Sequence, residues 1–361
     1  MAFPPSLTPS QLTDFLIGVM HKMQKEDPTD IVTPNYPLFK RMESKGYKTI
    51  VEESPGHGPV RDIYYQTEDR YTELSASQQI QPRDYRPQQH STRAQFNWIM
   101  VINTLTVALY EYKNCKTPEA LVDVIARKKK GTDKSHRNKQ VNYLWSGRTL
   151  GQEKLFGLND AIRFTTTSDP TRGAIGGISV ADLGDWTNKS ANFNANYQTF
   201  VSGAETQTFL DEGAKSLLQL YNDCGYNSQE AGESHPDLIP CNSVYYRCCH
   251  KLARQGIMFY DDNATKELGV PGITFQKATI FEDRNIPNDP NNSAYGVAKL
   301  LNSNAWNFVY ASGIRNNWEP PVVLQGDTAI AWDKITQVSI AYEDLGRMGV
   351  HYGVIGTVAA S

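Results

Sequence analysis

The sequence has few cysteines, no large excess of charge of either sign and no long apolar run. Its five cysteines, an odd number, predict no disulfide framework, and no basic segment followed by an apolar one marks a secretory leader, so a reducing cytoplasm is expected. Lysine and arginine total 36 against 39 acidic residues, which argues against a chain built as a whole to bind nucleic acid. The longest apolar stretch, residues 99–109, is about half of a bilayer span, so no membrane role is expected.

The motifs of common enzyme classes are missing as well. The sequence contains no G-x-x-x-x-G-K-[ST] phosphate loop, no G-x-G-x-x-G after a strand, no H-E-x-x-H and no G-x-S-x-G. The glycine-rich segment at residues 173–178 lacks the lysine of a phosphate loop, and we expect a tight turn there. We therefore predict no cofactor, no catalytic residue and no metal site, and we expect that the chain is not an enzyme.

Two groups of reactive side chains keep an alternative open. Cys241, Cys248, Cys249 and His250 are of the types that bind zinc, so a thiol or metal enzyme is the remote alternative. Neighbouring helical positions point about 100° apart and cannot all converge on one ion, so buried structural thiols are expected instead.

The acidic pairs at residues 261–262 and 282–283 have the chemistry of an acid–base pair or of a cation site. Turn residues flank both pairs, and no D-x-D-x-D-G loop is present. We expect solvated turns at both places.

At 361 residues the chain is long enough for about two compact units. Apolar spacing predicts an amphipathic helix over residues 8–23, and an irregular segment with a proline and glycine border follows it up to residue 57. Residues 60–93 are polar and are expected to form either a long exposed hairpin or a disordered loop. Residues 96–110 favour a strand that is buried on both faces.

A long helix is predicted over about residues 117–145. Thr117 is a suitable N-cap, Pro118 suits the first helical position, and Gly131 is where this helix would break. Further helices are expected over 204–224 and 243–255, and strands over 272–281, 306–310, 334–341 and 351–358. Helices and strands are mixed without a strict βαβ order or a repeat, so the expected class is α+β.

The long predicted helix carries a basic stretch that is opposed only by Asp133. Its members are Arg127, Lys128, Lys129, Lys130, Lys134, Arg137 and Lys139. Such a stretch is usually a solvated helix face, and the sharper interpretation is contact with a phosphate backbone. Aromatic residues are not interleaved within it, so any such contact would be independent of base sequence and sensitive to salt.

An ordered series of local segments covers about half of the chain. It runs from Gly157-Leu158-Asn159 through Gly173–Ile178 and Trp186, then Pro236–Ile239 with Tyr245-Tyr246, Leu268-Gly269, Phe275–Ile280 with Asp283 and Pro287, and Tyr295 leading to Leu301-Asn302 and Trp306. This series, and the order of arm, exposed loop, strand, long helix and mixed body, resembles the major capsid proteins of tailed bacteriophages, which share the Hong Kong 97-type fold.

The resemblance implies a division of the chain into named parts. Residues 1–57 would be an N-terminal arm, 58–97 an extended E-loop, 98–150 a peripheral domain with a spine helix, 151–300 an axial domain, and 301–361 strands returning to both domains. Glycines at 56, 58 and 131 would act as hinges that let these parts tilt.

The resemblance also implies a structural function. Many copies would assemble as pentamers and hexamers into an icosahedral head around double-stranded DNA, together with portal, scaffolding and cement proteins. The chain would be made in the cytoplasm of a bacterial host and end in the virion, with the basic stretch facing the DNA. The alternative within the same fold is an encapsulin-like compartment that encloses protein instead of a genome.

Overall fold

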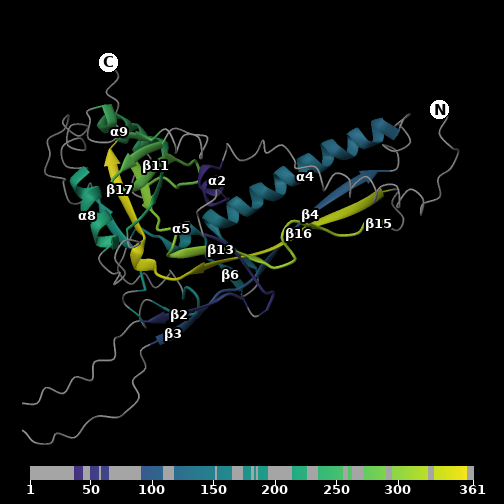
Figure 1. The fold of residues 1–361 in the computed structure, drawn as a ribbon, viewed down its shortest axis with the longest axis horizontal. Helices are drawn as coiled ribbons and strands as arrows, with labels where there is room; N and C mark the ends of the chain where they lie inside the picture. The colour runs from purple at the N-terminus through teal and green to yellow at the C-terminus, as the bar shows by residue number, and fades with distance from the viewer. Residues whose placement is uncertain are drawn as a thin grey trace, which may run out of the picture.

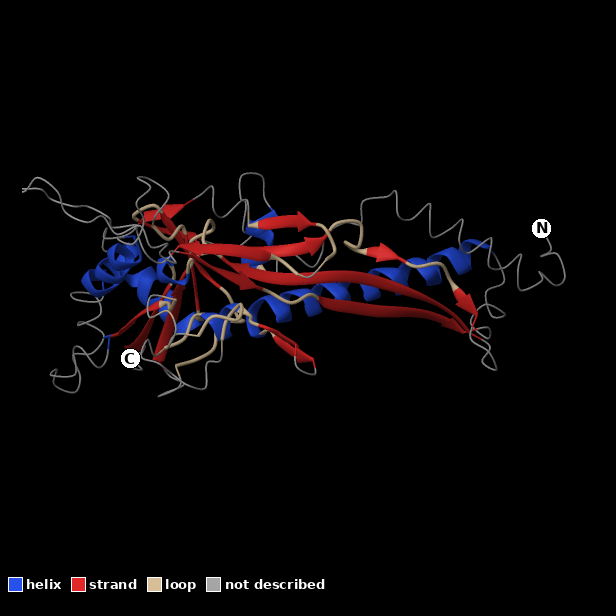
Figure 2. Ribbon diagram, turned by 90° about the horizontal axis from the view of Figure 1, so that it is seen from below, coloured by secondary structure: helices blue, strands red, loops and turns tan. Residues whose placement is uncertain are grey.

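The computed structural model describes residues 36–43, 49–56, 58–64, 91–108, 118–150, 153–164, 174–179, 183, 186–193, 214–225, 235–254, 259–261, 272–289, 295–323 and 329–355. These residues form an elongated molecule with a sheet-rich body at one end (Figure 1). A long helix, α4, extends from this body alongside two long strands, β4 and β16 (Figure 2). The helix that the sequence predicts over residues 8–23 lies outside the described residues.

Two regular elements occupy part of the segment that we expected to be irregular. Helix α2 (Pro37–Glu43) begins with a proline, whose missing N–H costs nothing at the first helical position, and buries four of its seven residues. Strand β1 (Ile50–Glu53) pairs in parallel with β13 (Trp306–Ala311). The expected irregular structure was wrong for these two elements. Strand β1 pairs with a strand of a sheet, and α2 packs beside the long helix, and both partners are remote in sequence.

The base of the predicted hairpin is present. Strands β2 (Val60–Tyr64) and β3 (Ser91–Gln95) pair antiparallel, and residues 65–90 between them lie outside the described residues. Gly58 precedes β2 with φ +98°, and a Cβ there would lie 1.9 Å from the carbonyl oxygen of Phe96. Glycine is therefore required at this close approach of two backbone segments.

Strand β4 (Ile99–Ala108) lies where a strand was predicted, but it is not buried on both faces. Ile99, Val101, Leu105 and Val107 are buried, whereas the residues between them are exposed or half-buried. The run looked fully buried because both of its faces carry apolar side chains. The structure shows a strand with helix α4 on one face and solvent on the other.

The long helix is the element that the sequence predicted best. Helix α4 (Pro118–Ser146) begins at the predicted proline and runs for 29 residues. It is continuous through Gly131, so the expected break is wrong; a Cβ at Gly131 would meet nothing within 4 Å. The helix ends before Gly147, whose positive φ of +63° turns the chain and whose N–H donates to the carbonyl oxygen of Tyr143.

A six-stranded sheet underlies the helix. Its order is β1-β13-β16-β14, with β15 and β4 also paired to β16. Strand β16 (Ala329–Tyr342) joins the two ends of this sheet, since its first part pairs with β4 and its last part with β13. The short strands β14 (Asn317–Trp318) and β15 (Val322–Val323) pair with it on the side away from β4.

A compact junction follows helix α4. Strands β5 (Arg148–Leu150) and β6 (Glu153–Leu155) form a hairpin that leads into the short helix α5 (Leu158–Ala161). The ammonium group of the fully buried Lys299 donates to the carbonyl oxygens of Leu158 (3.1 Å) and Ile162 (3.2 Å) at this short helix. These bonds attach the turn after α4 to the sheet of the body.

That second sheet has seven strands in the order β7-β17-β12-β8-β11-β10-β9. The strands are β7 (Lys189–Asn192), β17 (Gly349–Ile355), β12 (Tyr295–Leu300), β8 (Leu238–Cys241), β11 (Ala278–Glu282), β10 (Gly272–Phe275) and β9 (Phe259–Asp261). Residues 272–281, expected as one strand, are two antiparallel strands, because a turn at residues 276–277 with Gln276 at φ +54° reverses the chain.

Helices α8 (Ala214–Gly225) and α9 (Ser243–Arg254) pack on this sheet, and the 3-10 helix η3 (Leu345–Arg347) precedes β17. Both helices were predicted in these places, although residues 204–213 of the first prediction lie outside the described residues. The predicted strands over 306–310 and 334–341 are confirmed within β13 and β16, and the strand predicted over 351–358 is confirmed as far as residue 355 in β17, since residues 356–358 lie outside the described residues.

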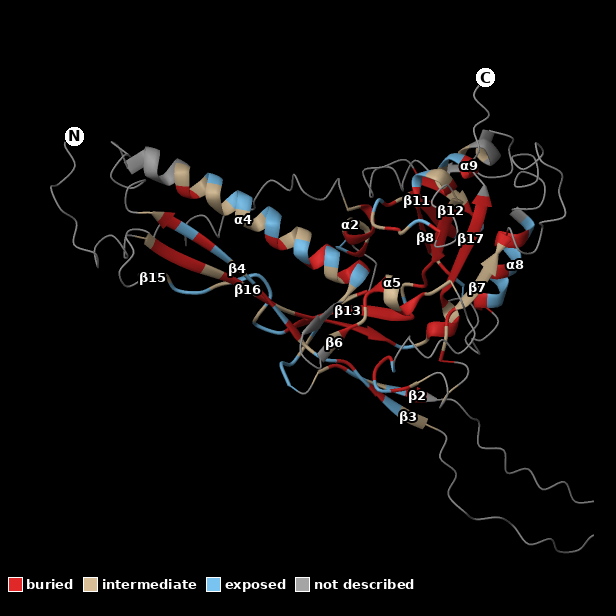
Figure 3. Cartoon of the chain, turned by 180° about the vertical axis from the view of Figure 1, so that it is seen from behind, coloured by how far each residue is buried: buried red, intermediate tan, exposed pale blue. Residues whose placement is uncertain are grey.

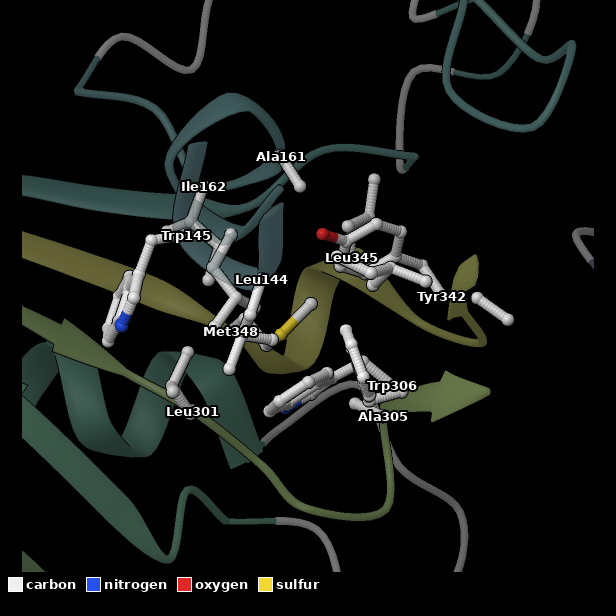
Figure 4. Packing of buried hydrophobic residues seen from close by; sticks show 14 of the residues in the cluster. Leu144, Trp145, Ala161, Ile162, Leu301, Ala305, Trp306, Tyr342, Leu345 and Met348 are labelled. Atoms are coloured by element: carbon white, nitrogen blue, oxygen red, sulfur yellow. The ribbon is translucent and has the colours of Figure 1, made fainter. Parts of the chain in front are cut away.

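Two cores stabilise the molecule, and the buried residues concentrate in the body and along one side of α4 (Figure 3). The larger core lies where α4 enters the body, with Leu144 and Trp145 of the helix near Ile162, Trp306 and Met348 (Figure 4). The smaller core lies beneath α8 and α9. This mixed architecture confirms the predicted α+β class.

Candidate nucleic-acid interface

Three of the seven predicted basic residues form one exposed stripe on helix α4. Arg127, Lys130 and Lys134 are all exposed. At about 100° per residue and 1.5 Å of rise, these three positions fall within about 60° of arc and about 10 Å of helix length. Three cations at this spacing along one helix face can contact successive phosphate groups of a nucleic-acid strand.

The other four basic residues are distributed differently. Lys128 is half-buried and donates from Nζ to the carbonyl oxygen of Thr106 (3.0 Å), and Lys129 is half-buried too. Lys139 is exposed, but its position lies about 120° around the helix from Arg127. Arg137 contacts the N-terminal helix α2 through the carboxylate of Glu43. The predicted stretch is thus one stripe of three exposed cations. Lys128, Lys129 and Lys139 point away from it, and Arg137 lies at its edge but is paired with Glu43.

The single acidic residue of this stretch faces the sheet and not the stripe. Asp133 accepts a hydrogen bond from Nζ of Lys334 on β16 at 2.5 Å, and the exposed fractions of the two side chains are 22% and 11%. Since its negative charge is balanced by Lys334, it does little to weaken the field of the stripe. The sequence could not show this pairing, because 201 residues separate the partners.

A polar contact layer lies beneath the same part of the helix. The Nε2 atom of the buried His136 lies 2.7 Å from the hydroxyl of Thr336, and Gln140 contacts the side chains of Asn316 (3.3 Å) and Tyr310 (3.2 Å). Burial, assisted by the charge of Lys334, lowers the pKa of His136 to about 4. His136 is therefore neutral near pH 7 and adds nothing to the positive charge.

The face of the sheet opposite α4 has a different chemistry. Met100, Ile102 and Val322 are 49%, 54% and 60% exposed, an uncommon state for three large apolar side chains on one sheet. The β4–β16 register places Asp333 beside Thr104 on this face, and Thr104 donates a hydrogen bond to its carboxylate. We call these five residues the outer sheet face. Its one charged residue, Asp333, accepts this hydrogen bond, in contrast to the basic helix on the other side.

The cysteine group does not form a reactive centre. Cys241 on β8 and Cys248 and Cys249 on α9 are buried free thiols, and Cys241 donates from Sγ to the carbonyl oxygen of Phe281 (3.3 Å). Burial raises the pKa of Cys241 and Cys249 well above the usual value, so both stay protonated and poorly nucleophilic. Within the described residues, no three histidine, cysteine or acidic side chains are placed to bind one metal ion.

The acidic pair at residues 282–283 is only partly a solvated turn. Glu282 is half-buried, but Asp283 is 1% exposed and accepts hydrogen bonds from the backbone and side-chain nitrogens of Asn285, each at 2.9 Å. Burial raises the pKa of Asp283 to about 6. The expectation was wrong for Asp283 because helix α2, remote in sequence, covers it. The side chain of Asp261, in the other pair, lies outside the described residues.

The glycine-rich segment forms the predicted turn. Ile175 and Ile178 face each other as an antiparallel bridge, and Gly176 and Gly177 between them have φ values of +62° and +82°. These left-handed conformations favour glycine, and the segment packs against the hairpin strand β3 through a backbone bond from Gln95 to Gly176. Its glycines are explained by the turn.

The body contains a buried group of three hydrogen-bonded polar side chains that was not predicted from the sequence. His351 on β17 contacts the hydroxyl of Ser216 on α8 (3.0 Å) and the hydroxyl of Tyr245 on α9 (2.9 Å). Burial lowers the pKa of His351 to about 3. Although serine and histidine can form a nucleophile and its base, all three side chains are buried, and the contacts join two helices to a strand. Single residues scattered over 136 positions give no sequence motif.

No protein-family model and no curated protein matches the sequence, so comparison depends on solved structures. The capsid of cyanophage A-1(L) aligns with a TM-score of 0.55 and 10% identity over 92% of this chain and 96% of that chain. The holo-SrpI encapsulin complex of Synechococcus elongatus gives 0.52 and 11% over 95% and 97%. The capsid of the myovirus XM1 gives 0.51 and 11% over 84% and 90%.

These likenesses confirm the resemblance at the level of the fold. The chain has the Hong Kong 97-type fold, with α4 and the six-stranded sheet as its elongated part and the seven-stranded sheet as its body. The alignments cover 84–95% of this chain and 90–97% of the others, so the likeness concerns the whole architecture and not one motif. None of the helices in the described parts of the chain has the length and apolar character required to cross a membrane.

Proposed function

We propose that this chain is the major capsid protein of a tailed bacteriophage, assembling as pentamers and hexamers into an icosahedral head around double-stranded DNA. The observation that carries the proposal is the likeness to two phage capsids over 84% and 92% of this chain. The aligned structures are two capsids and an encapsulin complex, and this supports self-association of the present chain. It also supports a structural function and not an enzymatic one.

The two faces of the elongated part support a direction within such a head. The helix face presents Arg127, Lys130 and Lys134, which suits non-specific contact with packaged DNA. The outer sheet face is almost uncharged and apolar, and exposed patches of this kind are typical of protein contacts. We therefore place the helix face inward, toward DNA, and the outer sheet face toward other protein.

The proposal includes the division of the chain into parts. The β2–β3 hairpin falls within the proposed E-loop (58–97), and α4 falls within the proposed peripheral domain (98–150). Strands of residues 301–361 pair both with β4 and within the body sheet, which supports their assignment as strands returning to the peripheral and axial domains. Portal, scaffolding and cement proteins are the further partners that such a head would have, with assembly in the bacterial cytoplasm.

Charge reversal of the stripe tests the DNA contact. In the triple variant Arg127→Glu/Lys130→Glu/Lys134→Glu, shells should form normally while the DNA retained per head falls, because phosphates would face three negative charges. The matched control, Lys215→Glu/Arg247→Glu/Lys277→Glu, makes the same charge change at exposed positions of the body. DNA content per particle, from the absorbance ratio of purified heads, is the measurement. Heads of the stripe variant that keep the DNA content of the control would contradict the inward placement.

An encapsulin-like compartment is the second candidate, because the encapsulin complex aligns over 95% of this chain with a TM-score like those of the phage capsids. Negative-stain microscopy of the chain, expressed alone and with its neighbouring genes, separates the possibilities. Shells that fill with DNA when portal and packaging genes are present support the head. Shells that enclose a co-expressed protein and no DNA support the compartment, and a persistent monomer would contradict both.

A further inference from the structure

Helix α2 lies between the long helix α4 and the seven-stranded sheet of the body (Figure 1). It comes from the N-terminal part of the chain, whereas the covalent path from α4 to the body runs through the β5–β6 hairpin and α5. The chain also crosses between the two sheets from β12 to β13 and from β16 to β17, and contacts of α2 add a non-covalent connection between α4 and the body.

On one side, α2 and the residue before it contact α4 through polar and aromatic side chains. The hydroxyl of Tyr36 donates to Oδ1 of Asn138 at 2.7 Å. The guanidinium of Arg137 pairs with the carboxylate of Glu43 and lies 5.1 Å from the ring centroid of Phe39. The ion pair is well covered, with exposed fractions of 26% and 28%, so solvent screens it less than a surface pair.

On the other side, two carboxylates of the body meet α2. The backbone N–H of Leu38, in the first turn of the helix, acts with Asn285 to lower the pKa of Asp283 against the effect of burial. Burial raises the pKa of Asp237, just before β8, and hydrogen bonds from Ser303 and the charge of Arg41 on α2 oppose this shift. A carboxylate at the first turn of a helix also satisfies backbone groups that the helix itself leaves unpaired.

The centre of α2 is anchored by apolar packing. Leu38, Phe39 and Met42 are at most 2% exposed. The rings of Phe39 and of Phe308 on β13 pack in a T-shaped arrangement with their centroids 5.9 Å apart. The apolar side chains thus hold α2 in place, while longer polar side chains connect it to α4 and to the body. Such side chains can change rotamers and partners without uncovering the apolar anchor.

We propose that α2 is a strap that fixes the angle between helix α4 and the body, and that exchange of its polar contacts allows this angle to change. A closed shell of pentamers and hexamers requires copies of one chain to adopt slightly different shapes, so this role of α2 rests on the proposed function. The angle itself is a property of the single chain and can be measured without assembly.

The test compares the full chain with the double variant Tyr36→Phe/Glu43→Gln, which removes the hydrogen bond and the ion pair with α4 and creates no cavity. Glu52→Gln is the matched control, since it removes the Arg315–Glu52 pair (3.1 Å), which does not involve α4. Amide hydrogen exchange is measured on the unassembled chain, small-angle scattering gives its largest dimension, and electron microscopy gives the shell diameters.

We expect amides of residues 38–43 to exchange roughly tenfold faster in the double variant, as loss of two such contacts would produce, with wild-type rates in the control. Scattering from the double variant should show a broader range of molecular lengths, and shells of the double variant should show a broader range of diameters. The strap proposal would be overturned if the double variant exchanged faster but scattered like the wild-type chain. It would also be overturned if the double variant and the wild-type chain exchanged at the same rate. A wild-type chain that never forms shells contradicts the proposed function, whereas the exchange and scattering results still decide the strap.

Discussion

At the scale of single residues, His351 shows how burial determines the charge of a side chain. Both of its ring nitrogens contact hydroxyl groups, and no acidic group contributes to the shift of its pKa, which burial alone lowers to about 3. In the unfolded chain the same imidazole would titrate near its usual value of about 6.5. The folded state therefore binds fewer protons than the unfolded state between these two pH values.

The contribution of His351 to the stability of the protein should accordingly fall as the pH is lowered below about 6.5. His351 makes the unfolding free energy decrease by up to about 1.4 kcal/mol for each pH unit. Its stabilising contribution is fully lost only near its folded pKa of about 3. The variant His351→Gln can still bond Ser216 and Tyr245 but does not titrate, so its unfolding free energy should depend less on pH. Denaturant unfolding of both proteins between pH 8 and pH 5 measures the difference, and the titration of His136 cancels in the comparison. Parallel profiles for the two proteins would refute this account.

At the scale of elements, helix α4 has one weak position. Gly131 lies in the middle of a continuous helix, and a Cβ there would have no neighbour within 4 Å. Gly131→Ala should therefore raise the unfolding free energy by about 0.5–1 kcal/mol, because glycine loses more backbone entropy than alanine in a helix. Thermal and denaturant unfolding check this, with the exposed Ser135→Ala in the same helix as control. A destabilised Gly131→Ala would show that the helix needs glycine here, as the hinge hypothesis requires.

Helix α4 and strand β4 show which features of an element can be predicted from sequence. The start of α4 was predictable because Pro118 is a local signal, and its end because the apolar spacing stops at Trp145. The structure adds that Gly147, with positive φ, follows the helix. The burial of β4 was not predictable, because Met100 and Ile102 are apolar yet exposed. Their exposure depends on which face α4 covers, and that is decided by the sheet as a whole.

The candidate site was predictable in composition but not in geometry. The run of basic residues is visible in the sequence, and helical phase separates Arg127, Lys130 and Lys134 from Lys128, Lys129 and Lys139. Arg137 shares the phase of the stripe, and its pair with Glu43 of the distant helix α2 is what the sequence does not show. The balance of Asp133 by Lys334 depends on a pairing between distant segments. The burial of Asp283 beneath α2 has the same origin, since neither partner carries a local sign of the other.

At the scale of the whole molecule, the outer sheet face gives a test of assembly. Met100→Asp/Ile102→Asp should leave the unfolding free energy nearly unchanged, since both side chains are about half exposed, but it should prevent shell formation because two buried charges would face the partner. Leu218→Asp, on the exposed side of α8, serves as the control. Unfolding curves and particle counts by microscopy measure the two effects. Normal shells from the double variant would show that this face remains open to solvent.

The length of α4 makes the molecule a mechanical lever. A helix of 29 residues spans about 43 Å, and it contacts β4 and β16, so helix and sheet would move together about the fulcrum at which Leu144 and Trp145 enter the larger core. A rotation of about 10° at that fulcrum would move the far tip by about 7 Å. Displacements of a few tenths of an ångström among side chains at the fulcrum are thereby amplified into differences of reach between neighbouring copies, so a small local adjustment could select one curvature over another.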